Sequence, residues 1–282
     1  MRRIFVTLII LLSSGSSVIY AEQAEKIYIV GVVPQFEVRK LHGIWRPILD
    51  LLEEKSGYKF KIRGSSSIPD FEREFIEGKF DFAYMNPYHM VMANEQAGYI
   101  PLVRDHGRKL YGVLVVHKDS GITDPSQLNG KTLAFPSPNA LGASLQMRQE
   151  LHDKFNIEFK SKYAKTHDAV YLNVLLGEAA AGGGVQKTLN RQKNEYKQML
   201  RVIHKTKEVE PHPFSVLPKV PVDVRERVRA ALLDMGRSEK GQKLLVKIPI
   251  SKIDPASMDD YLMLKSLGLN RLYVAPSDSE NK

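Results

Sequence analysis

The 282-residue chain contains no cysteine. This absence excludes disulfides, zinc–thiolate sites, iron–sulfur clusters and thiol catalysis, and it also excludes the lipid-bearing cysteine of a bacterial lipoprotein. Long apolar runs are missing too, because no stretch beyond the N-terminal region reaches the roughly 18 apolar residues that a transmembrane helix needs. The fold must therefore be stabilised by its apolar core.

The common catalytic motifs are also absent. The sequence has neither G-x-S-x-G nor H-E-x-x-H, and its eight histidines lack metal-ligand spacing. The segment "GGGVQKT" (182–188) resembles a phosphate-binding P-loop, but Gln186 stands where that motif requires glycine, and the segment follows a predicted helix rather than a strand. We interpret its glycines as a helix C-cap and a loop. The sequence therefore predicts no enzyme activity, no cofactor and no metal.

The N-terminus has the layout of a secretory signal peptide. Arg2 and Arg3 precede an apolar run over residues 4–12, and a Ser/Gly stretch then leads to Ala21. The run is too short to span a bilayer. We predict a signal peptide over residues 1–21 and a periplasmic mature protein, with a retained N-terminal anchor as the alternative.

The charge balance favours anionic partners. Removal of residues 1–21 takes away two arginines and leaves 39 basic against 32 acidic residues, a net charge of +7. The basic residues are scattered and form no long run, so we predict no binding to nucleic acid.

Hydrophobic periodicity predicts an α/β protein with mostly parallel sheets, since strand and helix patterns alternate along the chain. The predicted strands are 26–33, 58–62, 80–85, 109–118, the end of 124–135, 158–164 and 200–206. The predicted helices are 40–56, one within 65–79, 87–97, 139–153, 166–182, 221–235, 237–246 and 255–267.

Three places could bind a ligand at the carboxyl ends of strands. The first is the turn within "AFPSPNALGAS" (134–144), where Asn139 is a good helix N-cap and Gly142 allows close approach of a backbone or ligand. A helix N-terminus favours anions, although most such turns only cap a helix. The second contains Tyr84 and Tyr88, whose alternative role is partial core burial. The third is His167 after the predicted cap Thr166, where a surface or capping role is the alternative.

Three stretches, taken together, resemble a known family. They are "GKFDFAYMNPYHM" (78–90), the run from "YGVLVVHK" to "GASL" (111–145), and "KTHDAVYLNVLLGEAAAGGGV" (165–185). The chain resembles the phosphate, phosphite and phosphonate substrate-binding proteins of ABC importers. This resemblance implies a type II periplasmic binding protein with two α/β lobes joined by two hinge strands. It places lobe one at 22–111 plus 207–282, and lobe two at 112–206.

The resemblance also implies a ligand site. Backbone N–H groups at the turn would hold an anion, with His167 beside them and the two tyrosines closing from lobe one. Asn139, Ala140 and Leu141 replace the family's three hydroxyl residues, and His212 stands where the family has an acid that binds an amine. The replacement of that acid by His212 argues against an aminoalkyl phosphonate as the ligand. The implied ligand-binding residues are Tyr84, Tyr88, Ser137, Asn139, Ala140, Leu141, Gly142, His167 and His212.

The predicted function is capture of a small anion, similar to phosphonate, phosphite or phosphate, by closure of the lobes. A monomeric protein would then pass the anion to an ABC-transporter permease. The alternative is a periplasmic sensor of the same fold that binds a different small ligand and signals to a membrane kinase.

Overall fold

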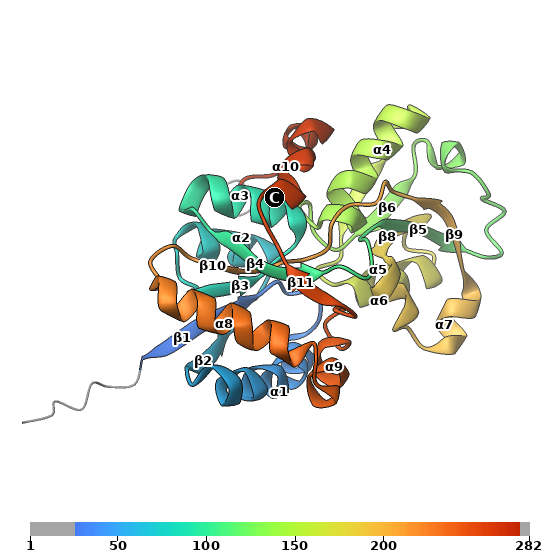
Figure 1. Ribbon diagram of the computed structural model, residues 1–282. Coiled ribbons are helices and arrows are strands. Elements are labelled where there is room, and N and C mark those ends of the chain that lie inside the picture. The colour runs from blue at the N-terminus through green and yellow to red at the C-terminus, as the bar shows by residue number, and fades with distance from the viewer. Residues whose placement is uncertain (1–25, 277–282) are drawn as a thin grey trace, which may run out of the picture.

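In the computed structural model, which describes residues 26–276, the alternating strands and helices form two mixed β-sheets with helices on their faces (Figure 1). The predicted signal peptide, residues 1–21, lies outside the described residues. No helix within residues 26–276 is both long and apolar enough to cross a membrane.

In the first sheet four strands run in one direction and two run in the opposite direction. Its strands are β1 (Ile27–Val32), β2 (Lys59–Arg63), β3 (Phe82–Tyr84), β4 (Ile100–Asp105), β10 (Phe214–Val216) and β11 (Ile253–Pro255). Their order is β11–β4–β10–β3–β1–β2. Strand β1 pairs in parallel with β2 and β3, whereas β10 runs antiparallel to β3 and β4. The helices around this sheet are α1 (Val38–Ser56), α2 (Ile68–Ile76), α3 (Pro87–Ala97), α8 (Val222–Met235), α9 (Glu239–Leu245) and α10 (Asp259–Leu262).

The second sheet is built by the middle of the chain. Its strands are β5 (Gly112–His117), β6 (Thr132–Phe135), β7 (Lys160–Tyr163), β8 (Ala181–Val185) and β9 (Leu200–Lys205), in the order β7–β6–β8–β5–β9. Strand β6 is parallel to β7 and β8, and β5 is antiparallel to β8 and β9. Its helices are α4 (Gln146–Phe155), α5 (His167–Leu175), α6 (Gln186–Asn190) and α7 (Asn194–Met199).

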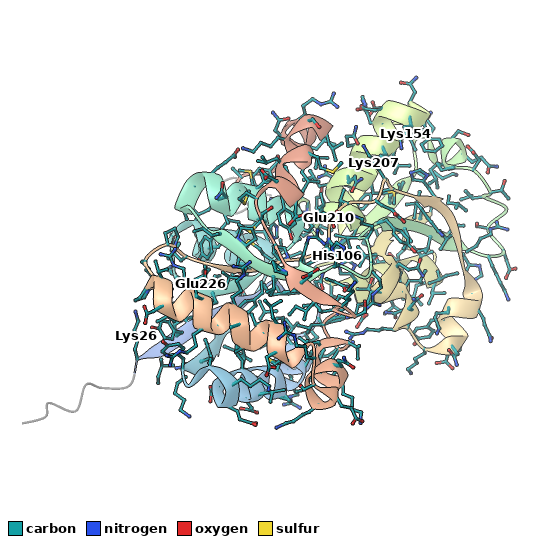
Figure 2. The ribbon with its side chains drawn as sticks, viewed as in Figure 1. Lys26, His106, Lys154, Lys207, Glu210 and Glu226 are labelled. Atoms are coloured by element: carbon teal, nitrogen blue, oxygen red, sulfur yellow. The ribbon has the colours of Figure 1, made fainter. Side chains whose placement is uncertain are left out.

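The chain crosses between the sheets twice, and the two crossings pair with each other. Leu110 and Val209 form an antiparallel bridge with two N–H···O bonds of 2.9 Å. Glu210 on the returning segment lies between the two sheets (Figure 2) and forms an ion pair with Arg104. Paired crossings of this kind can serve as a hinge. The lobe boundaries given above stay a prediction.

The glycines of segment 182–184 were assigned wrongly from the sequence. They form the centre of strand β8, between β6 and β5, and not a helix cap and loop. A Cβ on Gly183 would overlap the carbonyl oxygen of Ala143 and lie 2.7 Å from the ring of Phe135. Glycine is present because neighbouring groups occupy the space of a side chain. Consequently "QKT" follows a strand after all, although Gln186 still departs from the P-loop pattern.

The strands missing from the sequence prediction are β4, β10 and β11. Two of them have only three residues, and both β4 and β11 contain a proline. Short segments with proline have a weak strand pattern. Their antiparallel pairing makes the first sheet mixed rather than mostly parallel. The second sheet is mixed because β5 runs antiparallel to β8 and β9.

Candidate functional site

The turn after β6 differs from the predicted capped helix. A single π-helical turn, Leu141–Leu145, precedes α4, and Ala140 occupies the flanking position. The prediction of Asn139 as N-cap is therefore wrong, because its side chain points to other partners. Its Nδ2 donates to Glu72 Oε2 at 2.9 Å and to the Val274 carbonyl at 2.7 Å, and its Oδ1 accepts from the Val274 N–H.

A small cavity of about 20 Å³ lies at this turn. It brings together five predicted site residues, which are Ala140, Leu141, Gly142, His167 and His212. The first N–H groups of a helix have no intrahelical acceptor, so those of the turn are free to face the cavity. Gly142 is close to a backbone, as expected, since a Cβ there would lie 2.9 Å from the N atom of Gly112. A cavity of this size holds about one water molecule.

A second cavity, of about 450 Å³, adjoins the first between the two sheets. Gln35 and His212 line both cavities, and Tyr84 lines the larger one. Its walls come from the β1–α1 loop, helix α1, both crossings, helix α6 and the segment after α9. Five cationic and two acidic residues line it, namely Arg108, Lys109, Lys187, Arg191, Lys247, Asp105 and Glu208.

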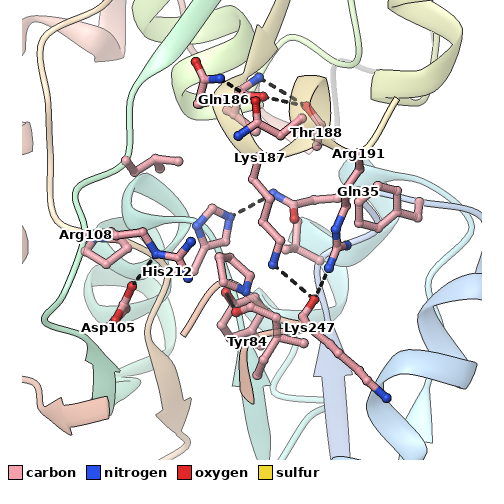
Figure 3. Close-up of a pocket in the computed structure, with 18 of the residues that line it drawn as sticks. Gln35, Tyr84, Asp105, Arg108, Gln186, Lys187, Thr188, Arg191, His212 and Lys247 are labelled. Atoms are coloured by element: carbon pink, nitrogen blue, oxygen red, sulfur yellow. Dashed lines mark hydrogen bonds and ion pairs between the residues drawn. The ribbon is translucent and has the colours of Figure 1, made fainter. Parts of the chain in front are cut away.

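Lys187 on α6 and Arg191, which directly follows α6, reach into the larger cavity (Figure 3), although the sequence did not mark either as a site residue. Both donate to one acceptor, the carbonyl oxygen of Lys247, at 3.1 Å in the case of Lys187 Nζ. Arg108 enters from the first crossing, with its Nε 3.3 Å from Asp105 Oδ2. The signal that could have identified Lys187 is a lysine shortly after a glycine-rich strand, in "GGGVQK". It was missed because the glycines were assigned to a helix cap and loop.

The remaining predicted residues lie outside both cavities. Tyr88 is buried and packs edge-on against Tyr273, with ring centroids 5.7 Å apart. The side chain of Ser137 is buried, and within residues 26–276 its Oγ has no hydrogen-bond partner. Trp45, by contrast, lines the larger cavity although it packs against Tyr84 and is only 2% exposed.

Two buried histidines at the cavities are neutral. Desolvation lowers the pKa of His167 to about 4 and that of His212 to about 3. His212 stacks on Tyr84 with ring centroids 5.4 Å apart, and Gln35 Nε2 donates to its Nε2 over 3.0 Å. A neutral imidazole that accepts at Nε2 carries its proton on Nδ1, so His212 can donate one hydrogen bond. Thr166 caps α5, as predicted, by accepting from the Ala169 N–H.

Desolvation, and then repulsion from Arg191 and Arg108, lower the pKa of Lys187 to about 6, although Asp105 acts in the opposite direction. An unfolded lysine titrates near pH 10.4. Between about pH 6 and pH 10 the unfolded state therefore holds more protons, and this group makes stability rise with pH. Burial and the neighbouring arginines thus outweigh the negative charge of Asp105 at this lysine.

Lys187→Met should remove this contribution. Urea denaturation in steps from pH 5.5 to 9.5 should show the unfolding free energy of the wild type gaining on that of the variant as the pH rises above about 6. Below that pH the difference should be constant. Parallel curves across the range would contradict the assignment.

Comparison with known proteins identifies the family. A model described as "ABC transporter, phosphonate, periplasmic substrate-binding protein" matches residues 30–261. The structure resembles a binding-protein component of a phosphonate ABC transporter from Pseudomonas aeruginosa, with a TM-score of 0.78, 18% identity and coverage of 89% of each chain. It also resembles PhnD1 from Prochlorococcus marinus in complex with methylphosphonate, with a TM-score of 0.79, 17% identity and coverage of 88% of this chain and 98% of that one.

The protein XAC2383 from Xanthomonas citri, solved with chloride, matches with a TM-score of 0.74 and 18% identity over 87% of this chain and 98% of that one. The shared architecture confirms the type II periplasmic binding-protein fold. The family description favours a transport component over the sensor alternative. This chain belongs to the periplasmic phosphonate substrate-binding proteins of ABC transporters.

Proposed function

We propose that the protein captures an anionic solute in the periplasm, between its two lobes, and delivers it unaltered to the permease of an ABC importer. The observation that carries this proposal is the larger cavity, where five lysine and arginine residues line the walls with only two acidic ones. The family description and the methylphosphonate bound to the Prochlorococcus protein support it. The turn residues Ala140–Gly142 and His167 would line the smaller cavity that adjoins the bound solute.

Side-chain contacts between the elements around the first sheet and those around the second support lobe closure. Lys40 on α1 forms an ion pair of 3.3 Å with Asp168 on α5, and Asn86 Nδ2 donates to the Asn139 carbonyl. Lys187 Nζ on α6 donates to the carbonyl oxygen of Lys247, in the segment after α9. A ligand that contacts both lobes stabilises the closed form at the expense of the open one. The predicted boundaries, with the second lobe at 112–206, belong to this proposal.

The test is calorimetric titration of the mature protein, stripped of ligand by unfolding and refolding, with phosphate, phosphonates and carboxylates. We expect at least one anion to bind and Arg191→Met to weaken its binding by about tenfold or more, since a charge-assisted hydrogen bond is lost. The control is Lys160→Met, an exposed lysine on β7 that lines neither cavity. Binding that Arg191→Met leaves unchanged, or chemical alteration of the bound anion, would overturn the proposal.

A further inference from the structure

The two cavities differ too much in size and lining to take the same ligand group. The cavity at the turn, about 20 Å³, is lined by Val33, Ile68 and Leu141 among others. A tetrahedral oxyanion does not fit a space for one water. The larger cavity, about 450 Å³, lies within the range of about 300–1,000 Å³ that binds drug-sized ligands. A ligand that fills this cavity is an organic molecule rather than a bare oxyanion.

The charges in the larger cavity are not balanced by the protein. Lys187 and Arg191 converge on one neutral acceptor, the Lys247 carbonyl. Asp105, whose charge favours the protonated form of Lys187, already accepts from the Ser251 and Lys252 N–H groups, at 3.0 and 2.8 Å. Glu208, the other acid that lines the cavity, is exposed. Within residues 26–276 neither Lys187 nor Arg191 forms an ion pair with a carboxylate, so a bound anionic group would pair with Arg191 and favour the protonated form of Lys187.

An apolar wall adjoins these cations. The centroid of the Phe36 ring lies 5.3 Å from the guanidinium carbon of Arg191, and the ring lines the cavity. Leu41, Ile44 and Trp45 on α1 continue the wall. Figure 3 shows Lys187 and Arg191 directed together across the cavity toward Lys247. One ligand can therefore contact the cations at one end and the aromatic and aliphatic wall at the other.

We infer that the ligand is an amphipathic organic anion, with a phosphonate or carboxylate group between Lys187 and Arg191 and an apolar body against Phe36, Leu41 and Ile44. This inference rests on the proposed function and specifies its ligand class. The charged group would thus be held by the side chains of Lys187 and Arg191 instead of the backbone N–H groups of the turn.

The test compares two matched pairs by titration calorimetry on the full mature chain. The pairs are phenylphosphonate with methylphosphonate and phenylacetate with acetate, and benzyl alcohol serves as the uncharged probe. We expect the phenyl member of at least one pair to bind about tenfold more tightly, equivalent to about 1.4 kcal/mol. Which pair shows the preference identifies the charged group.

Two variants locate the apolar body. Phe36→Ser should abolish the preference for the phenyl member and leave the affinity for the small member within about twofold. Leu41→Ala, at a partly buried position, repeats the test if the first variant does not fold. Equal affinities within both pairs would overturn the inference but leave the proposed function standing. Failure of every anion to bind, or equal binding of benzyl alcohol and phenylphosphonate, would overturn both.

Discussion

Gly183→Ala should destabilise the protein by about 3 kcal/mol and weaken ligand binding. The added Cβ would overlap the carbonyl oxygen of Ala143 and lie 2.7 and 2.9 Å from two carbons of the Phe135 ring. A side chain can rotate away, but the Ala143 carbonyl belongs to the π-helical turn that walls the small cavity. Strand β8 or the turn must therefore move. Urea denaturation measures the first effect, and calorimetric titration with phenylphosphonate measures the second.

Gly43→Ala is the matched control for this substitution. Gly43 is exposed within α1, and a Cβ there would meet nothing within 4 Å. Alanine in a helix interior is favoured over glycine by about 0.5–1 kcal/mol, so this variant should be no less stable than the wild type. A Gly183→Ala protein that unfolds at the wild-type urea concentration would show that β8 tolerates a side chain.

Asn139→Ala should cost about 3 kcal/mol of unfolding free energy and shift the protein toward an open form. The substitution removes the donor to Glu72, whose side chain is fully buried and otherwise contacts His89 at 2.8 Å. It also leaves both backbone groups of Val274 without the Asn139 amide. Buried polar groups that lose a partner cost about 1–3 kcal/mol each, and more when charged. Urea denaturation should show the loss, and small-angle scattering should show a larger radius of gyration.

Ser137→Ala provides the comparison on the same turn. Within the described residues 26–276 the buried Ser137 hydroxyl has no hydrogen-bond partner, so its removal should change stability by less than about 0.5 kcal/mol. A similar loss in both variants would mean that the turn responds to any substitution. An unchanged radius of gyration for Asn139→Ala would separate its stabilising role from control of closure.

The sequence prediction succeeded where a local pattern had one physical interpretation. Helix α1 follows from apolar spacing and from Gly57, which ends it in the left-handed conformation. The Thr166 cap of α5 was predictable because the threonine side chain accepts a hydrogen bond from a backbone N–H only three residues later. The prediction missed strand β8 because its three glycines are required by Phe135, Ala143 and other groups, which come from distant parts of the chain and leave no space for a side chain.

The candidate site was predicted only in part, for a related reason. His167 and the turn residues Ala140–Gly142 do line one small cavity, as their positions at strand ends suggested. Asn139 is of a residue type that often caps helices. Its side-chain amide nevertheless forms hydrogen bonds with Glu72 and Val274, which no local pattern indicates. The roles of His167, Ala140–Gly142 and Asn139 in ligand binding stay predictions.

The sequence by itself determined the family, the α/β class and the absence of thiol chemistry, because these depend on residue types and on ordered motifs along the chain. Only the tertiary structure decided where positive charge gathers. Lys187 lies on the short helix α6 and Arg191 directly follows it, but Arg108 enters from a crossing and Phe36 from a loop. A cavity is formed by segments that fold together from distant positions. Its volume and its unbalanced charge therefore exist only after folding, and they govern which anion the protein can hold.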